Sequence, residues 1–366
     1  MPPQTRPTEG DDVLMKKKEL QGVKEIARRA NVAIATVDRV IHNRGGVSEK
    51  TREKILAIIQ ELDYQPNLLA RRLASGKSNR LVALIPSATP ELDFWDAPRR
   101  GIQRADAEVR AYGLRVDELF FDLNDKQTFV EQTRLILANP PDGVVLAPMF
   151  VEEARAFALA CGERGIPYVF IDSNIPDLAS LSYIGPPLFE SGYLAGRLST
   201  YALRGAGRVL VVNLAADLES FTYRRIEEGF RAYLTEHRPA CLVDRIDLHE
   251  TDQTAVSTAL SAYLTAHPDL DLIFVTNSRT FLVARFLESS SLPTKPMLIG
   301  YDLVQKNSQY LQQGTIDFLI CHQPEDQGYR SIMALYQHLV FQTPVEAVHY
   351  MPIDIVTREN SLFYEN

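Results

Sequence analysis

The sequence predicts a small all-α unit near the N-terminus, followed by a larger α/β unit built on doubly wound parallel sheets. Two short helical patterns adjoin each other between residues 23 and 44, and this pairing predicts the all-α unit. From residue 81 onward, short apolar runs alternate with longer helical stretches. Strands that are buried on both faces and separated by helices are typical of parallel sheets with helices on each side.

The first helical pattern, V-K-E-I-A-R-R-A, is separated by an Asn-Val turn from the second, I-A-T-V-D-R-V-I-H-N-R. The apolar residues of both recur at helical spacing and predict one small core: Val23, Ile26, Ala27, Ala30, Val32, Val37 and Val40. The exposed side of the second helix would then face a DNA major groove, as in a helix-turn-helix. We expect the DNA contacts there from Ile34, Ala35, Thr36, Arg39, His42 and Asn43. A short amphipathic hairpin without this role is the alternative interpretation.

The charge of the chain is distributed unevenly. Residues 16–77 contain 14 Lys and Arg against 7 Asp and Glu, whereas residues 78–366 carry a net charge of −13. A basic unit on an acidic body is expected when only one end of a chain meets phosphate groups. This asymmetry favours double-stranded DNA as a partner.

A third helix and a short apolar segment follow. Ser48 is placed to cap a helix whose buried stripe is Ile55, Ile58, Ile59 and Leu62. The next segment, D-Y-Q-P-N-L-L-A-R-R-L-A-S-G-K-S, predicts a short helix that begins near Pro66 and ends before a linker. Its leucines would be costly to expose, so they need a partner surface. A DNA minor groove or the same segment of a second subunit would supply one.

In the body, the apolar runs predict strands and the stretches between them predict helices. The predicted strands are L-V-A-L-I-P, D-G-V-V-L-A-P, P-Y-V-F-I-D, R-V-L-V-V-N-L, D-L-I-F-V-T-N and M-L-I-G-Y-D. The predicted helices lie near 98–112, 126–138, 152–164, 188–204, 223–237, 252–266, 279–290 and 325–341. About 290 residues are many for a single sheet, so two similar lobes with a cleft between them are expected.

Polar residues end several of these strands, namely Asp172, Asn213, Asn277 and Asp302. In open α/β sheets the ligand crevice lies at the carboxyl ends of the strands. These side chains are therefore expected to point into a ligand site.

Other function classes find little support. No apolar run approaches the roughly 18 residues of a membrane span, and the N-terminal residues lack the apolar core of a signal peptide, so a cytoplasmic protein with no membrane partner is expected. Cys161, Cys241 and Cys321 are isolated, and the seven histidines lack ligand spacing. We therefore expect no metal, no cofactor and no catalytic residues. A glycosidase uses a pair of acidic residues, and Asp172 and Asp302 could form such a pair, but no other feature of the sequence supports this enzyme class.

Residues 23–76 resemble the DNA-binding headpiece of the lactose repressor (LacI/GalR) family. The motifs that carry the resemblance are V-K-E-I-A, T-V-D-R-V, V-S-E-K-T-R and P-N-L-L-A-R-R-L, in the family's order and spacing. The resemblance implies that Ile34 and Ala35 read bases, that Arg39 reaches a base edge or a phosphate, and that Asn67, Ala70 and Leu73 belong to a hinge helix. Leu73 would be wedged into the central minor-groove step. Gly22 and Ala33 depart from the family's usual capping hydroxyls.

The body, residues 80–366, is similar to periplasmic sugar-binding proteins with two lobes joined by three crossings. The similarity is strongest at I-P-S-A-T-P-E-L-D-F-W, F-V-T-N-S, L-I-G-Y-D and Q-P-E-D-Q-G-Y. It implies that Phe94 and Trp95 sandwich a sugar ring and that polar groups surround its hydroxyls: Asp172, Arg224 or Arg225, Asn277, Asp302 and Gln323. Ser173 stands where the ribose binders have Arg, which argues against ribose.

Each of these assignments has a structural alternative. Phe94 and Trp95 could be core aromatics, Asp302 could cap the following helix, Asn277 could simply end its strand, and the arginines could be solvated. The domains expected are an N-terminal extension, disordered, at 1–20, a helix-turn-helix domain at 21–65, a hinge and linker at 66–79, and a two-lobed effector and dimerisation domain at 80–366. Lobe 1 is expected at about 80–178 plus 319–344, and lobe 2 at about 179–318 plus 345–366.

The function expected is a sugar-responsive transcriptional regulator, most simply a repressor, that binds a pseudo-palindromic operator as a homodimer. The same type of regulator sensing a nucleobase or another metabolite is the first alternative. A transporter's sugar-binding protein without DNA function is the second, and the basic headpiece argues against it.

Overall fold

The computed structural model describes residues 22–41, 44–62, 64, 78–89, 93–215, 221–292 and 294–364. The chain divides into two compact units, Met1–Ser78 and Asn79–Asn366, close to the junction expected at residue 80. His42, Asn43 and the hinge positions Asn67, Ala70 and Leu73 lie outside the described residues. The DNA contacts expected from these five residues therefore stay predictions.

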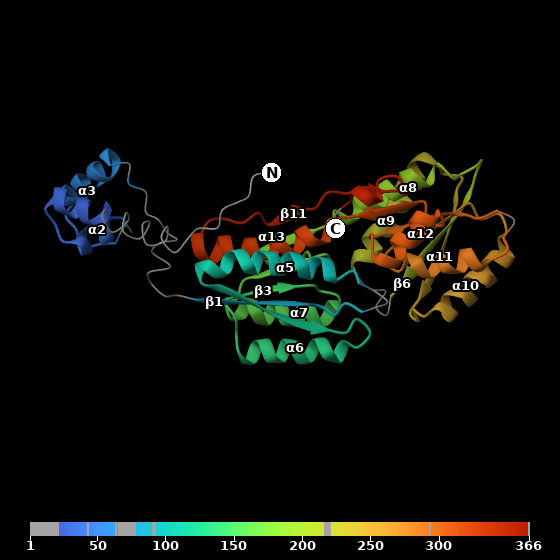
Figure 1. Ribbon diagram of the computed structural model, residues 1–366, viewed down its shortest axis with the longest axis horizontal. Coiled ribbons are helices and arrows are strands. Elements are labelled where there is room, and N and C mark those ends of the chain that lie inside the picture. Colours follow the sequence, from blue (N-terminus) through green and yellow to red (C-terminus); the bar gives the residue numbers. More distant parts are fainter. Residues whose placement is uncertain are drawn as a thin grey trace. The chain divides into compact units, whose positions relative to one another are not determined.

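The N-terminal unit is all-α, as predicted. Residues 22–30 are helical, and the next two helices are α2 (Ile34–Ile41) and α3 (Glu49–Glu61) (Figure 1). Asn31 has a left-handed backbone with φ of 57°, which supplies the turn between the first two helices. The Ser48 hydroxyl accepts a hydrogen bond from the Thr51 amide at 3.3 Å, so the predicted cap of α3 is confirmed. The core joins all three helices through Ile26, Ala27, Ala30, Val37, Val40, Ile55 and Ile58.

Packing explains why position 22 is glycine rather than the Thr or Ser that is usual in the lactose repressor family. A Cβ atom on Gly22 would lie 2.6 Å from the Cε2 atom of Tyr64, closer than real Cβ contacts allow. The Tyr64 ring therefore occupies the space that a larger residue would need at the start of the first helix. A residue with a capping hydroxyl at position 22 would require the Tyr64 ring to move.

The first sheet of the α/β unit has six parallel strands in the order β11-β5-β4-β3-β1-β2. Its strands are β1 (Asn79–Pro86), β2 (Leu114–Phe121), β3 (Gly143–Leu146), β4 (Tyr168–Ile171), β5 (Ser182–Gly185) and β11 (Val348–Tyr350). Figure 1 shows α5 (Asp96–Val109) and α13 (Pro324–Tyr336) on one face, with α6 (Lys126–Ala138) and α7 (Val151–Glu163) on the other. Short turns of 3-10 and π-helix extend α5 and α13, at Arg110–Tyr112 and Gln337–Phe341.

The second sheet has the order β12-β10-β9-β8-β6-β7, and only β12 runs antiparallel to its neighbour. Its strands are β6 (Arg208–Leu214), β7 (Leu242–Leu248), β8 (Leu272–Val275), β9 (Met297–Tyr301), β10 (Phe318–Cys321) and β12 (Asp354–Val356). The helices α8 (Leu188–Ser199) and α9 (Phe221–His237) pack on one face. The other face carries α10 (Gln253–Ala266), α11 (Thr280–Ser289) and α12 (Gln305–Gln313).

The fold class and the eight helices predicted in the body are confirmed, and so are the six apolar strands. The sequence patterns missed β2 and β7 because charged residues interrupt their apolar residues without a regular alternation, and both are partly buried edge strands. Strands β5, β10, β11 and β12 were not predicted either. The polar helix α12 also went unpredicted.

The crossings between the lobes lie a few residues later than expected. Strand β5 pairs with β4 in the first sheet, β10 pairs with β9 in the second, and β11 returns to the first. The expected boundaries at 178, 319 and 345 would place each of these strands in the other lobe. The reason is that a crossing follows the strand that completes a lobe, and these short strands had not been recognised.

One close helix crossing, between α5 and α13, holds the first lobe together. A Cβ atom on Gly101 of α5 would lie 1.8 Å from the Glu325 carbonyl oxygen of α13, and one on Gly328 would lie 2.0 Å from the Pro98 carbonyl oxygen. Side chains at these positions would force the helices apart. Helix α13 is thereby fixed to the first lobe although it follows a strand of the second.

Two further findings concern the described part of the chain. It contains no helix long and apolar enough to cross a bilayer, and no group of three or more metal-ligating side chains. The three cysteines are free thiols, and Cys161 and Cys321 are buried in the two cores. Burial raises the pKa of the Cys161 thiol to about 11, which keeps it protonated and unreactive.

Candidate functional site

Helix α2 presents the expected DNA-reading surface of the N-terminal unit. Val37 and Val40 are buried in the three-helix core, whereas the Ile34 side chain is 48% exposed. Ala35 and Arg39 are also exposed, and Thr36 is partly so. An exposed isoleucine beside an alanine offers apolar contacts of the kind that thymine methyl groups accept.

The acidic residues near this surface form ion pairs with arginines other than Arg39. Asp38 pairs with Arg44 at 3.4 Å, and Glu25 pairs with both Arg28 and Arg29. These ion pairs lower the pKa of Glu25 to about 2 through its hydrogen bonds with Arg28 and Arg29. Among the described residues Arg39 has no acidic partner, so its guanidinium is available for phosphate or base edges.

A cavity in the α/β unit is lined by residues of both lobes. The first lobe contributes residues after β1, β2, β3 and β4, and the second contributes residues of α9 and residues that follow β8, β9 and β10. The expected effector residues that line it are Phe94, Trp95, Asp172, Asn277 and Asp302. The lining also includes residues that sequence reasoning did not single out: Leu123, Met149, Thr222, Tyr223, Thr276, Ser278, Arg279, Tyr301 and His322.

The aromatic pair lies in the cavity wall, but its geometry differs from the one expected. The Phe94 and Trp95 rings contact each other edge to face, with centroids 5.2 Å apart and planes at 90°. Trp95 is only 3% exposed and precedes the first residue of α5. Because the two rings touch, a sugar ring cannot be sandwiched between them. A single aromatic face against the ligand is the arrangement that remains possible.

Asp172 and Asp302 enter the cavity from opposite lobes. Each follows the end of a strand and has a left-handed backbone, with φ of 65° and 64°. In the described part of the chain, neither carboxylate receives a hydrogen bond or an ion pair. Asp302 does not cap α12, whose N-cap residue is Val304.

The environment of these two carboxylates disfavours their charged forms. Burial raises the pKa of Asp172 to about 6. Burial also raises the pKa of Asp302 well above its usual range, and the negative charge of Asp172 raises it further. Two acceptors without donors in one enclosed site are suited to the hydroxyl groups of a sugar.

Asn277 lines the cavity, but its amide group is engaged by the backbone. Its Nδ2 atom donates to the Leu214 carbonyl oxygen at 2.7 Å, and its Oδ1 atom accepts from the Arg279 amide at 3.1 Å. Arg279 itself extends into the cavity and donates to the Leu214 carbonyl oxygen at 3.2 Å. Burial lowers the pKa of its guanidinium, which has no carboxylate partner among the described residues.

The expected arginines of α9 do not reach the cavity. Arg224 is 64% exposed and lies 4.0 Å from Glu228, and Arg225 pairs with the same carboxylate at 2.6 Å. The Arg225 guanidinium also lies over the Phe189 ring, 5.0 Å from its centroid. Arg279 supplies the cavity's guanidinium instead. Arg279 stands two residues beyond Asn277, directly after the motif F-V-T-N-S. Its position beside this motif could have identified it as a cavity residue from the sequence.

Gln323 also lies outside the cavity lining, where its neighbour His322 takes the expected place. The Gln323 side chain donates to Asp354 at 2.9 Å, and its amide donates to the Tyr364 hydroxyl at 3.3 Å. These bonds tie two of the segments that cross between the lobes. Gln323 has a left-handed backbone, with φ of 49°, at the point where the chain passes from β10 to α13.

His322 is buried and held by a short hydrogen-bond chain. Its Nε2 atom lies 2.9 Å from the Ser191 hydroxyl, which lies 2.9 Å from the Tyr301 hydroxyl. Burial lowers the pKa of His322 to about 3, so the imidazole is neutral at physiological pH. A neutral imidazole adds no charge to a cavity that already holds two carboxyl groups.

The cavity measures about 80 Å³, well below the roughly 300–1,000 Å³ of typical small-molecule pockets. The lobes meet directly beside it, where the Thr222 hydroxyl of the second lobe donates to the Ser173 hydroxyl of the first at 2.8 Å. The Gln305 amide of α12 donates to Asp93 of the first lobe at 3.2 Å. The structure is therefore that of closely approached lobes, and a monosaccharide enters only if they move apart.

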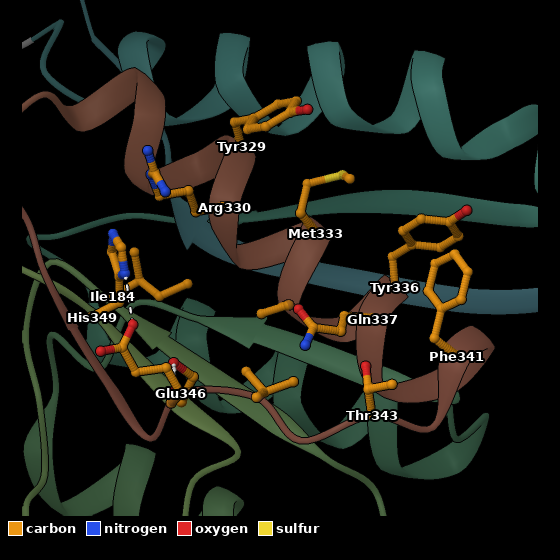
Figure 2. Close-up of a pocket in the computed structure, with 13 residues that line it drawn as sticks. Ile184, Tyr329, Arg330, Met333, Tyr336, Gln337, Phe341, Thr343, Glu346 and His349 are labelled. Atoms are coloured by element: carbon orange, nitrogen blue, oxygen red, sulfur yellow. Dashed lines mark hydrogen bonds and ion pairs between the residues drawn. The ribbon is translucent and has the colours of Figure 1, made fainter.

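A larger cavity of about 540 Å³ lies entirely within the first lobe, between α13 and the segment that leads to β11 (Figure 2). Its lining is mostly apolar and includes Met333, Tyr336 and Phe341, while His349 and Glu346 pair at 3.1 Å on its rim. Because one lobe supplies all of its walls, a ligand there would not sense the approach of the lobes. The cavity between the lobes is the better candidate for an effector.

Comparisons with known proteins agree with this architecture. Residues 22–67 match the family model described as bacterial regulatory proteins, lacI family, and residues 82–343 match the periplasmic binding protein domain. The ribose operon repressor of Halalkalibacterium halodurans is 24% identical over 353 residues, which cover 94% of this chain and 98% of that repressor. The lactose operon repressor of Escherichia coli is 26% identical over 349 residues, covering 92% and 90% of the two chains.

A solved structure extends the similarity. A protein from Bacteroides fragilis, assigned as a LacI transcriptional regulator, is 31% identical and superimposes with a TM-score of 0.72. The match covers 79% of this chain and 100% of that one. The chain belongs to the lacI family of bacterial regulatory proteins, with that family's DNA-binding domain ahead of a periplasmic binding protein domain.

Proposed function

We propose that this protein is a transcriptional repressor whose affinity for its operator is controlled by a sugar bound between the two lobes. The observation that carries the proposal is the interlobe cavity, in which two carboxyl groups without donors and one buried tryptophan meet. The same chain carries an exposed DNA-reading helix, so ligand binding and DNA binding are combined in one molecule.

At the operator, α2 lies in the major groove with Ile34, Ala35 and Arg39 toward the DNA. The apolar pair selects positions with thymine methyl groups, and Arg39 contacts a phosphate or a base edge. Two subunits bind the two halves of a pseudo-palindromic site as a homodimer. We expect the hinge and linker predicted at 66–79 to supply paired hinge helices, with Leu73 inserted into the minor groove at the centre.

In the cavity, Asp172 and Asp302 accept hydrogen bonds from sugar hydroxyls, and the Trp95 ring covers an apolar face of the sugar. A hydroxyl that is missing or inverted leaves a carboxylate unpaired, at a cost of about 1–3 kcal/mol. The cavity thus distinguishes epimers by the donors that it requires. The two lobes contribute one carboxylate each, so the sugar is gripped only when they close.

The crossing segments connect this closure to the rest of the first lobe. The Gln327 side chain of α13 accepts from the Asp172 amide at 3.2 Å and donates to the His322 carbonyl oxygen at 3.0 Å. Closure around a sugar therefore moves α13, which is packed against α5. The effect of sugar on DNA affinity equals the effect of DNA on sugar affinity, because the two equilibria are linked.

The test has two steps, both with the full-length protein. Operators are first selected from random double-stranded DNA, and their affinities are then measured by fluorescence anisotropy with and without members of a sugar panel. At least one sugar should change operator affinity fivefold or more. Asp302→Ala should bind the same operator as tightly as the wild type and lose the response. Selection of no DNA sequence would contradict the proposal, as would an unchanged response in Asp302→Ala.

A further inference from the structure

We infer that the effector is an anionic sugar, whose phosphate or carboxylate group occupies a second cavity beside the first. This inference rests on the proposed function and narrows its ligand class. The second cavity measures about 180 Å³ and shares Arg279 and Leu123 with the interlobe cavity. A ligand whose ring lies in the first cavity can therefore extend into the second past Arg279.

Three basic side chains line the second cavity, all from the second lobe: Arg279, Arg285 and Lys306. In the described part of the chain none of them pairs with an acid. Lys306 lies over the Phe281 ring at 4.9 Å, and Arg279 donates only to a backbone carbonyl. By contrast, Arg208 pairs with Asp244, and Arg231 pairs with Glu227 at 2.6 Å, elsewhere in the same lobe.

Three cations gathered at one cavity without counter-ions repel one another, and burial adds a desolvation cost at Arg279. An anion between them removes both costs, because guanidinium and ammonium groups bind phosphate and carboxylate through charge-assisted hydrogen bonds. The cavity also lies at the start of α11 and α12, where helix N-termini add a favourable potential for negative charge.

Two acids share this cavity, and the Oδ1 atom of each is engaged by nearby donors. Asp252 caps α10 by accepting from the Thr254 and Ala255 amides at 2.8 and 3.0 Å. Asp122 accepts from the amide and the side chain of Asn124 at 2.8 and 3.2 Å. Each has a local structural task, and together they leave the lining with a net positive charge.

Besides Asp122, the first lobe contributes neutral hydrogen-bonding side chains to the cavity. Ser87, Thr89 and Asn124 line it opposite the basic residues of the second lobe. An anionic group held by the cations would meet these donors only when the lobes approach. Charge on the ligand would therefore promote closure as well as binding, which a neutral sugar cannot do at this position.

The first experiment uses inorganic phosphate as the probe and the full-length protein. The midpoint of thermal unfolding is measured against phosphate concentration, with sodium chloride at equal ionic strength as the reference. The apparent Kd for phosphate should rise at least fivefold in the double variant Arg285→Gln/Lys306→Gln. The control variant Arg224→Gln/Arg225→Gln removes two basic side chains of the same lobe outside both cavities, and it should bind phosphate like the wild type. Equal stabilisation of the wild type and the cavity variant, or none of either, would overturn the inference.

The second experiment compares each neutral sugar with its own anionic derivatives. Glucose, glucose 6-phosphate and glucuronate form one series, and galactose, galactose 6-phosphate and galacturonate form another, measured by calorimetry. An anionic member should bind at least tenfold more tightly than its neutral parent, and the cavity variant should lose most of that difference. The two derivatives of each series distinguish phosphate from carboxylate as the group recognised.

The outcomes separate the two proposals. Neutral parents that bind as tightly as their derivatives, and change operator affinity, would refute the anionic ligand and leave the repressor function standing. Anionic sugars that bind through Arg285 and Lys306 but never change operator affinity would contradict the repressor function. If no sugar binds, the sugar effector is refuted, and the phosphate titration still decides whether the anion subsite exists.

Discussion

The Thr222 hydroxyl donates to the Ser173 hydroxyl across the cleft, with the two oxygen atoms 2.8 Å apart. Ser173 follows Asp172 in the first lobe and is 1% exposed, whereas Thr222 belongs to α9 of the second lobe. This bond exists only while the lobes are close together, beside the effector cavity. The bond between Thr222 and Ser173 therefore stabilises the closed form relative to the open form.

Removing this bond should weaken sugar binding without touching the sugar. Ser173→Ala eliminates a hydrogen bond that is present only in the closed form, and such bonds contribute about 0.5–1.5 kcal/mol. The Kd for the sugar should rise roughly twofold to tenfold, as measured by calorimetry. Ser199→Ala is the matched control, because that buried hydroxyl donates to Gly196 within α8. Equal Kd values for Ser173→Ala and the wild type would argue against the interlobe role.

The raised pKa of Asp172 predicts a stability effect that depends on pH. The carboxyl has a pKa of about 6 in the folded protein against 3.8 ordinarily, so the folded form holds its proton more tightly. The free energy of unfolding therefore falls as pH rises from about 4 to above 6. At neutral pH the cost of the buried charge amounts to about 3 kcal/mol.

Asp172→Asn keeps the shape of the side chain and removes that cost. The ligand-free variant should unfold at a higher temperature than the wild type at pH 8, with a smaller gain at pH 5 and weaker sugar binding at both. Differential scanning calorimetry at the two pH values checks this. A gain that is the same at pH 5 and pH 8, or absent from both, would show that Asp172 does not bear the raised pKa.

Trp95 should report ligand binding directly, because it is the only tryptophan of the chain and it lines the cavity. Its emission should change in intensity or wavelength when the effector is added, since a ligand in the cavity alters the surroundings of the ring. Trp95→Phe should abolish the signal and retain part of the affinity. A ligand shown by calorimetry to bind without any change in emission would place Trp95 away from the site.

Leu73→Ala should abolish tight operator binding and leave the Kd for the sugar unchanged. The expectation comes from the sequence resemblance, in which this leucine wedges into the minor-groove step at the operator centre. Leu56→Ala is a suitable comparison, because this leucine of α3 is 47% exposed in the headpiece and outside its core. Operator affinity of Leu73→Ala within twofold of the wild type would refute the hinge assignment.

The local patterns of the sequence were sufficient for most of the elements. The helix-turn-helix core, the Ser48 cap and the central strands of both sheets were predicted, because each depends on residues close in sequence. Asn277 and Asp302 were expected to lie together because they follow β8 and β9, neighbouring parallel strands of the second sheet. Asp172 follows β4 of the first sheet and lines the same cavity from the other lobe.

The edge strands and the crossings were beyond such patterns. Charged residues interrupt the apolar residues of β2 and β7, and β5, β10 and β11 were not predicted either. Their membership in a sheet is decided by pairing with strands distant in sequence. The expected lobe boundaries therefore fell on the wrong side of these short strands.

What the sequence by itself determined is the family, the two fold classes and the strand ends from which the cavity is built. Only the tertiary structure decided which side chains face the cavity: Arg279 after β8 rather than Arg224 or Arg225 of α9, and His322 rather than Gln323 after β10. The physical reason is that side-chain direction in the residues after a strand changes with each backbone torsion, as at Gln323. Those torsions depend on contacts between segments far apart in the chain, which spacing within one segment does not encode.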